Sequence, residues 1–559
     1  MKPVTALAAA SLLLASIGIS HAQESQTDKR REIAEGPFEP TWTSLAENYQ
    51  APDWFRDAKF GIWAHWSAQC EPEAGDWYAR HMYLQGHRQY EDHLERYGHP
   101  ADSGFMEIEN LWKAENWAPE RLMDLYVRAG AKYFVALANH HDNFDCFDSD
   151  HHEWNSVDVG PKKDIVGTWA RIARQHGLRF GVSNHSAHSW HWYQAAYAYD
   201  ATGPRAGERY DAYTLTKEDG AGKWWEGLDP QTLYNGPLMA MPDGLNTIEA
   251  QSKWHTENTA DWTEEPPEGE LGRKFVDTWF LRAQDLVDKY QPDLLYFDNY
   301  TLPLGQAGLD VAAHYYNASL DWHDGEPEAV INVKGTSEDR LGAVIDDIER
   351  GVAFGIRENP WQTDTCIGDW HYNRDVYEEG RYKSVSQVAR MLADIVSKNG
   401  NLLLSIPIRG DGTLDEAEIA FLEGLADWMD INGEAIFSTR PWKIYGEGPS
   451  TEEEPEAGHY GGAKDVREAP YTAADIRFTT KDEALYAIVM QHPDSDQTIT
   501  IKALGSDSDL ASDKTIQSVR LLGASQEIEW SRDAEGLHVL IPEEISSPHT
   551  LTLEIRGAL

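Results

Sequence analysis

Apolar runs that end in polar or titratable residues recur along the first three-quarters of the chain. The uninterrupted apolar residues 294–297 run into Asp298, and residues 132–138 run into Asn139 and His140. Apolar runs without alternation are typical of strands buried on both faces, as in a parallel sheet. Similar runs occupy residues 59–64, 178–182, 329–334, 343–348 and 401–405. The pattern therefore predicts parallel strands whose carboxyl ends carry side chains suited to catalysis.

Helix-like segments separate several of these runs. They occupy residues 118–129, 165–175, 275–290, 385–397 and 415–431. Asp164 is placed to cap the second of them, and Gly177 follows its end. Because no glycine-rich phosphate loop follows the first strand, the repetition favours an α/β chain with a (β/α)8-like TIM barrel over an open sheet.

The pattern of apolar and polar residues changes from about residue 440. Short β-type runs separated by Gly, Asp and Ser turns occupy residues 474–479, 484–491, 498–503, 516–522, 536–541 and 549–555. Such spacing predicts a C-terminal β-sandwich. We expect the barrel over residues 51–445, with a polar, Trp-rich insertion at about 187–270, and the sandwich over residues 460–559. The Glu/Pro/Gly-rich stretch 447–463 is the expected boundary.

The N-terminus has the pattern of a secretory signal peptide. Lys2 precedes an apolar stretch at residues 6–19, and Ser20-His21-Ala22 offers a small-x-small cleavage site. We expect residues 1–22 to be removed, residues 23–50 to form a lead-in arm, and the mature protein to be periplasmic or extracellular. No later segment has the length and apolarity of a membrane span.

Composition narrows the class of partner. The chain has 48 basic and 94 acidic residues, a net charge of −46, which argues against nucleic-acid and anionic-membrane partners. Its 22 Trp and 25 Tyr exceed what a core needs, and carbohydrate sites use such rings as stacking surfaces. Three cysteines allow at most one disulfide, and buried free thiols are an equally good interpretation. The oligomeric state stays open.

Two carboxylates are required to hydrolyse a glycosidic bond, one as acid and one as base or nucleophile. Asp298 is the first candidate, and Glu349 is the second, with Asp346 and Asp347 as competitors. Strand-end histidines and the ring of Tyr296 suit hydroxyl recognition and ring stacking. These histidines are His65, His140, His141 and His185.

The same histidines raise the alternative of a metal site. His140 and His141 are adjacent, so on a strand they would point to opposite sides and rarely bind one ion. No His-x-His or His-x-x-x-His pair occurs among these positions, and no Gly-x-Ser-x-Gly nucleophile motif is present. We therefore expect a sugar site without a metal or other cofactor.

Ordered motifs over roughly residues 50–445 resemble glycoside hydrolase family twenty-nine, the α-L-fucosidase family. They are KFGIWAHW with DWY, YFVALANHHDNF, KKDIVG, GLRFGV, PDLLYFDN, WQTDTCIGDWHY, VSKNGNLLLSIP, DGTL and NGEAIFSTRPW. The resemblance implies a retaining double displacement with Asp298 as nucleophile and Glu349 as acid/base. It also implies fucose-hydroxyl contacts from His65, His140, His141 and Trp77, with Asp76 standing where the family usually has Glu. Trp361, which opens its motif, joins the expected binding residues.

Three positions depart from the family pattern. Asn299 follows Asp298 in place of Gly, His185 lies where a Tyr often serves, and Lys334 stands where a substrate-binding Arg is usual. Lys lacks the bidentate geometry of Arg, so these changes bear on sugar and linkage specificity. The sequence thus predicts an exported, exo-acting α-L-fucosidase acting on fucosylated oligosaccharides or polysaccharides. The alternatives are a glycosidase for another α-linked sugar, such as galactose, and a non-catalytic glycan-binding protein.

Overall fold

The computed structural model describes residues 31–259, 262–335, 340, 342–452, 463–464, 471–493, 498–542, 547 and 549–559. The expected signal peptide, the start of the arm and most of the expected domain boundary lie outside these residues. Eight parallel strands close into a barrel, because β1 pairs with both β2 and β9. In barrel order the strands are β1 (Phe60–Ala64), β2 (Tyr133–Asn139), β3 (Arg179–Asn184), β4 (Leu294–Phe297), β5 (Val330–Lys334), β6 (Ile345–Asp347), β8 (Trp361–Cys366) and β9 (Gly400–Ser405). The predicted barrel is confirmed.

Burial on both faces explains why these strands are apolar without alternation. One side of each strand faces the barrel interior, where Trp63, Tyr133 and Leu294 belong to one buried cluster. The other side packs on the surrounding helices through a larger cluster that includes Ile62 and Phe134. A strand enclosed in this way has no solvent face to carry polar residues.

Strand β8 is the barrel strand that the apolar pattern does not predict. Its sequence is WQTDTC, and all six residues are buried. The polar side chains are satisfied inside the barrel, since Gln362 accepts from the Tyr133 hydroxyl at 2.9 Å and donates to Asp347 at 2.7 Å. Buried polar groups that bond one another remove the hydrophobic signal of a core strand.

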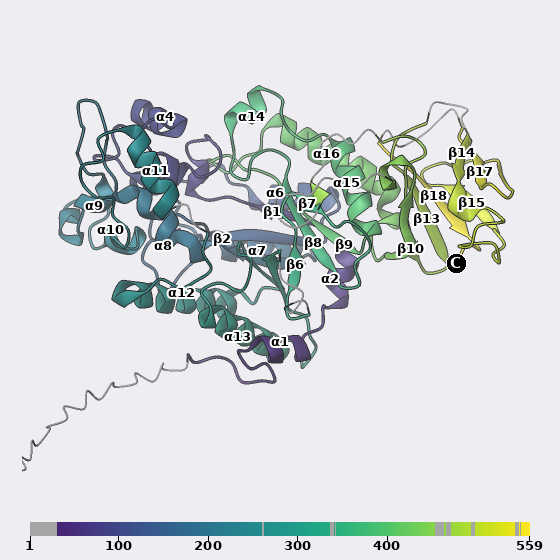
Figure 1. Cartoon of the computed structure of the whole chain (residues 1–559), viewed down its shortest axis with the longest axis horizontal. Coiled ribbons are helices and arrows are strands. Elements are labelled where there is room, and N and C mark those ends of the chain that lie inside the picture. Colours follow the sequence, from purple (N-terminus) through teal and green to yellow (C-terminus); the bar gives the residue numbers. More distant parts are fainter. Residues whose placement is uncertain are drawn as a thin grey trace, which may run out of the picture. The chain divides into compact units, whose positions relative to one another are not determined.

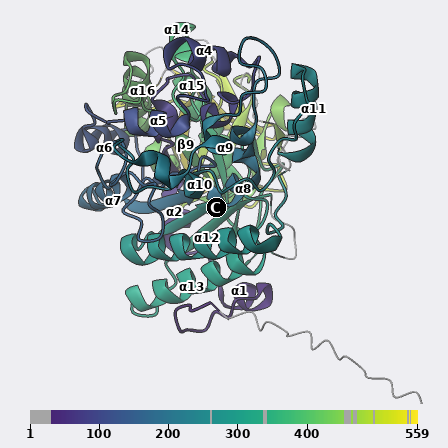
Figure 2. The same cartoon turned by 90° about the vertical axis from the view of Figure 1, so that its left-hand side faces the viewer.

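The helices cover the outside of the barrel (Figures 1 and 2). They include α6 (Pro119–Arg128), α7 (Ile165–Gln175), α12 (Gly269–Tyr290), α13 (Gln306–Trp322), α15 (Val385–Ser397) and α16 (Glu416–Asn432). Asp164 caps α7, accepting from Gly167 N at 2.9 Å. Helix α12 begins at Gly269, six residues before the predicted start, and both views show it beside α13, with α1 (Trp42–Asn48) next to α13.

The insertion between β3 and α12 contains short helices that the sequence pattern does not predict. They are α8 (Ser189–Trp192), α9 (Asp211–Thr214), α10 (Pro230–Leu233) and α11 (Ile248–Asn258), which gather on the left of Figure 1. The buried residues of α11 are Gln251 and His255, both polar. A helix without an apolar stripe gives no periodic signal.

Two antiparallel sheets form the C-terminal region, which confirms the predicted sandwich. One has the order β10-β12-β13-β18-β15 and the other β14-β17-β16, and a shared apolar core lies between them. The strands are β10 (Arg440–Glu447), β12 (Ile476–Lys481), β13 (Ala484–Val489), β14 (Thr498–Ile501), β15 (Ser518–Leu521), β16 (Trp530–Arg532), β17 (Leu537–Leu540) and β18 (Leu551–Arg556). The first sheet begins at Arg440, inside the range expected for the barrel.

A buried ion pair joins this sheet to the barrel. Asp394 of α15 contacts Arg477 of β12 at 2.5 Å and Lys398 at 2.6 Å. The side chains are between 3% and 7% exposed, so this contact between helix and sheet excludes water.

Two further features concern the whole described chain. Cys70, Cys146 and Cys366 are buried free thiols. No helix of the described residues is long and apolar enough to cross a bilayer.

Candidate active site

A cavity of about 300 Å³ opens at the carboxyl ends of the barrel strands, a size at the low end for small-molecule sites. Its lining is Trp63, His65, Asp76, Trp77, His140, His141, His185, His188, Trp262, Asp298, Asn299, Tyr300, Lys334, Glu349, Arg350, Asp364 and Trp370. Carboxylates, imidazoles and indoles share one wall, which is the mixture that binds hydroxyl groups and sugar rings. Nine of the eleven residues expected at the site line this cavity.

Asp298 directly follows β4 and is held by cationic and imidazole groups. Its Oδ2 lies 3.1 Å from His185 Nδ1 and 3.3 Å from His141 Nε2, and its Oδ1 contacts the ammonium of Lys334. Burial by itself would raise the pKa of Asp298, but Lys334, His185 and the hydrogen bonds of both histidines hold that pKa well below its usual value. The carboxylate is therefore ionised at neutral pH, as a nucleophile must be.

Lys334, the last residue of β5, contacts Asp298 and Glu349 with the same nitrogen. Burial opposes its charge, but the two carboxylates raise the pKa of Lys334 well above its usual value. The competing acids lie elsewhere, since Asp346 pairs with Arg357 at 2.6 Å and Asp347 is bonded inside the barrel. Glu349 is the acid of this segment that lines the cavity.

The strand-end histidines form a compact group. Rings of His65 and His185 lie 5.0 Å apart, and rings of His140 and His185 lie 5.1 Å apart, measured between centroids. Burial lowers the pKa of His65 and His140 well below the usual value, and burial lowers the pKa of His185 to about 4. Neutral imidazoles both donate and accept hydrogen bonds, which suits sugar hydroxyls.

The expected divergence of His140 and His141 is wrong. Their ring centroids lie 4.3 Å apart and both line the cavity, because β2 ends at Asn139 and the turn beyond it has no strand alternation. Ligand atoms of His65, His140 and His185 lie within 4.8 Å of one another, as do those of His141, His185 and Asp298. The spacing thus also fits a metal ion, the alternative that the strand-end histidines raise.

Asp76 and Trp77 enter the cavity from the loop before α3 (Tyr78–His81). Trp77 caps this helix in the left-handed conformation, with φ of 64°. Asp76 Oδ1 accepts from His371 N at 2.8 Å, which ties this loop to the one after β8. Both expected binding residues are thus held at fixed positions on the cavity wall.

Tyr296 and Trp361 are the two expected site residues that the structure does not bring to the cavity. Tyr296 points into the barrel interior and donates its hydroxyl to Asp364 Oδ2 at 3.0 Å. Trp361 begins β8, at the opposite end of the strand, and donates its indole N–H to Lys398 O at 2.9 Å. Tyr296 therefore reaches the site through Asp364, whose pKa burial raises to about 6.

Eight lining residues were not expected from the sequence: Trp63, His188, Trp262, Asn299, Tyr300, Arg350, Asp364 and Trp370. Arg350 and Asn299 adjoin the two expected catalytic carboxylates, and Trp370 lies in one of the family motifs given above. These three positions could therefore have been predicted from the sequence. Trp262 and His188 belong to the insertion, where no local pattern distinguishes them.

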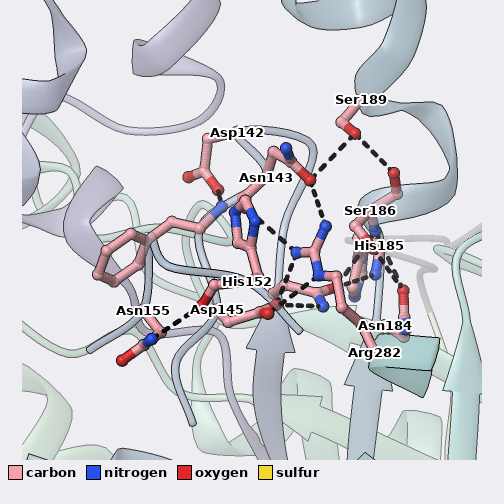
Figure 3. A network of polar contacts seen from close by, with 12 residues as sticks. Asp142, Asn143, Asp145, His152, Asn155, Asn184, His185, Ser186, Ser189 and Arg282 are labelled. Atoms are coloured by element: carbon pink, nitrogen blue, oxygen red, sulfur yellow. Dashed lines mark hydrogen bonds and ion pairs between the residues drawn. The ribbon is translucent and has the colours of Figure 1, made fainter. Parts of the chain in front are cut away.

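A buried polar network supports the histidine turns (Figure 3). Arg282 of α12 donates to Asp145 at 2.9 and 2.6 Å and to Asn143 Oδ1 at 2.6 Å. Asn139 donates to Asp145 at 2.9 Å, and its Oδ1 accepts from His185 N at 3.2 Å. The chain of contacts fixes the backbone that carries His185.

Comparison with protein families agrees with this geometry. The model described as "Alpha-L-fucosidase" matches residues 25–434, and the "Alpha-L-fucosidase C-terminal domain" model matches residues 470–556. The chain belongs to the α-L-fucosidase family. Members of this family are glycoside hydrolases, so the resemblance read from the ordered motifs is confirmed.

The matches to similar α-L-fucosidases cover nearly the whole of this chain. The tissue α-L-fucosidase of Homo sapiens is 24% identical over 545 residues, covering 95% of this chain and 92% of that protein. The plasma α-L-fucosidase of Homo sapiens is 25% identical over 532 residues, covering 90% and 89%. Among solved structures, the α-fucosidase of Thermotoga maritima in complex with fucose matches with a TM-score of 0.62 at 25% identity, covering 92% of this chain and 99% of that one.

Proposed function

We propose that this family member is an exported, exo-acting α-L-fucosidase that removes terminal fucosyl residues from glycans with retention of configuration. The observation that carries the mechanism is the position of Lys334, whose single ammonium nitrogen contacts both Asp298 and Glu349. Two oxygens that each lie about 3 Å from one nitrogen are at most about 6 Å apart. This close approach of one oxygen from each carboxylate supports the short carboxyl separation of retaining enzymes, about 5–5.5 Å, over the roughly 6.5–9.5 Å of inverting ones.

In the proposed reaction, Asp298 attacks the anomeric carbon and forms a covalent fucosyl–enzyme bond. The glycosidic C–O bond breaks, and the leaving oxygen takes the proton of Glu349, which enters the cycle as a neutral carboxyl group. Glu349 then removes a proton from water, the water oxygen bonds to the anomeric carbon, and the bond to Asp298 breaks. Free fucose leaves with the α configuration, and both carboxyl groups return to their starting states.

Three features support the other parts of the proposal. The cavity of about 300 Å³ suits one terminal sugar ring, which is what exo action requires. Neutral histidines and the indoles of Trp77 and Trp262 supply hydroxyl contacts and stacking surfaces. The N-terminal pattern of Lys2, an apolar run and Ser20-His21-Ala22 supports export.

The deciding experiment compares purified protein on 4-nitrophenyl α-L-fucoside and on the matching α-galactoside. We expect release from the fucoside, loss of turnover in Asp298→Asn with an unchanged circular dichroism spectrum, and α-fucose as the first product by proton NMR. Preference for the galactoside would favour the alternative sugar. Retained activity in Asp298→Asn, or β-fucose as first product, would refute the mechanism, and binding without turnover would favour a glycan-binding protein.

A further inference from the structure

Arg80 is a deeply buried cation without an acidic partner among the residues that the structure describes. Three arginines are buried among the described residues, namely Arg80, Arg282 and Arg477. Arg282 pairs with Asp145 at 2.6 Å, and Arg477 pairs with Asp394 at 2.5 Å. Arg80 is 4% exposed and contacts no carboxylate of the described chain. Burying an isolated charge is costly unless an opposite charge or strong hydrogen bonds compensate it.

The hydrogen bonds of Arg80 use only part of its donor capacity. One nitrogen donates to the carbonyl of Trp192, and another donates to Thr259 Oγ1 at 2.8 Å. A guanidinium carries five N–H donors in a planar fork that matches the oxygens of sulfate, phosphate or carboxylate. Burial lowers the pKa of Arg80 to about 10, so the group still carries its charge at neutral pH.

A second cavity of about 300 Å³ lies against Arg80, between the turn after α3 and helix α11. Its polar lining consists of Arg80, Gln85, His87, Gln251, Ser252, His255 and Thr256. None of the residues that line it is acidic, although acidic residues outnumber basic ones by 94 to 48 in the chain. A cavity whose polar lining consists of one cation and neutral groups, on a strongly acidic protein, favours an anion by its local chemistry.

From these observations we propose that the Arg80 cavity binds a tetrahedral oxyanion, either free sulfate or phosphate or a sulfate ester carried by a saccharide. Arg80 supplies the charge, and the hydroxyl of Ser252 and the side-chain amides of Gln85 and Gln251 supply neutral donors. Charge-assisted hydrogen bonds from a guanidinium to an oxyanion are among the strongest polar contacts in proteins. The bound anion replaces the carboxylate that the other two buried arginines have.

Helix α3 and Trp192 connect the Arg80 cavity to the active-site cavity. Trp77 lines the active-site cavity and caps α3, and Arg80 belongs to the same helix. The backbone carbonyl of Trp192 accepts from Arg80, and the ring of Trp192 lies 5.4 Å from the ring of His141, measured between centroids. A sulfated branch of a bound glycan would therefore meet the Arg80 cavity beside the site of hydrolysis, whereas a free anion would order the same residues.

Calorimetry on the intact protein tests the proposal without any turnover, so its outcome is separate from that of the proposed function. Sodium sulfate is titrated into the protein, and sodium chloride keeps the ionic strength constant. A monosulfated fucose is titrated in a parallel experiment. Saturable heat with inorganic sulfate identifies a free-anion site. Heat with the sulfated sugar but not with sulfate identifies a subsite for a sulfate ester.

Two variants on α11 complete the test. Ser252 lines the cavity on the exposed side of the helix, so Ser252→Asp adds a negative charge there without disturbing the bonds of Arg80. Lys253→Gln makes the same change in net charge one residue away, outside the lining. We expect Ser252→Asp to weaken binding at least tenfold and Lys253→Gln to leave it unchanged. Absence of heat with both ligands, or equal binding in Ser252→Asp and the native chain, would overturn the proposal.

Discussion

The indole ring of Trp262 lies 5.2 Å from the imidazole ring of His141, measured between centroids. Trp262 comes from the insertion between β3 and α12, whereas His141 follows β2. The same indole lies 5.4 Å from the ring of Trp77 and 4.9 Å from that of His188. The insertion thus supplies part of the wall of the active-site cavity, beside residues that the barrel strands position.

Removal of the Trp262 ring should weaken substrate binding. We expect Trp262→Ala to lower kcat/KM on an aryl α-L-fucoside about fivefold, chiefly through KM, because stacking on an aromatic ring is worth about 1 kcal/mol. Trp224→Ala is the matched control, since Trp224 belongs to the same insertion but is 40% exposed and bonds to Glu107. Equal kinetics in both variants would exclude Trp262 from the binding wall.

The acid/base role of Glu349 has a distinctive chemical signature. Glu349→Ala should lose about 10²–10⁴-fold in rate on glycans with poor leaving groups, the usual contribution of general acid catalysis, and much less on activated aryl fucosides. Added azide should restore turnover and yield α-fucosyl azide, because it attacks the β-linked intermediate on Asp298. Asp346→Ala serves as control, since Asp346 pairs with Arg357 outside the cavity. A β-azide product from Glu349→Ala would reassign the two carboxylates.

Glu264 should make folding stability depend on pH. It accepts from Asn299 Nδ2 at 2.6 Å and Tyr300 N at 2.8 Å, and burial raises its pKa from 4.5 to about 7. The unfolded chain releases this proton at lower pH than the folded chain, so the native protein loses stability as pH rises from about 4.5 to about 7. One pKa unit corresponds to 1.36 kcal/mol, which gives a loss of up to about 3 kcal/mol.

Glu264→Gln removes this titration. We expect the free energy of unfolding of the variant, relative to the native chain, to increase by up to about 3 kcal/mol between pH 4.5 and pH 7.5. Urea unfolding at several pH values measures the difference. Parallel curves for the two proteins would show that Glu264 titrates alike in the folded and unfolded states.

The network around Arg282 couples stability to catalysis. Arg282→Met leaves Asp145, which is fully buried, without its cation, and breaking such a pair costs about 3–5 kcal/mol. Because Asn139 links Asp145 to the backbone of His185, we also expect lower kcat/KM at temperatures where the variant stays folded. Arg477→Met removes a comparable buried pair between barrel and sandwich. It should lower stability alone, and equal kinetic loss in both variants would contradict the coupling.

Much of the architecture was predictable because burial leaves a direct record in the chain. Strands enclosed on both faces are mostly apolar unless their polar groups bond one another, so β1, β2 and β4 appear as uninterrupted runs. Each ends beside a residue of the cavity, since the carboxyl ends of parallel strands meet at one face of a barrel. Asp298, His65 and His140 were found in this way.

Residues that do not follow a buried apolar strand could be located only in the tertiary structure. Strand β8 carries Gln and Asp whose partners lie on other strands, so no local pattern reveals it. The side chain of Tyr296 points into the barrel interior, and Trp361 lies at the end of its strand opposite the cavity. Trp262 reaches the site from a loop that is distant in sequence.

By itself, the sequence determined the barrel, the C-terminal sandwich and the strand-end carboxylate Asp298, because hydrophobic burial and strand direction act locally along the chain. Only the tertiary structure decided that Lys334 joins Asp298 to Glu349, and that no carboxylate of the described residues pairs with the buried Arg80. Both are relations between segments far apart in sequence, and their energies depend on distance and solvent exclusion, which a linear pattern does not contain.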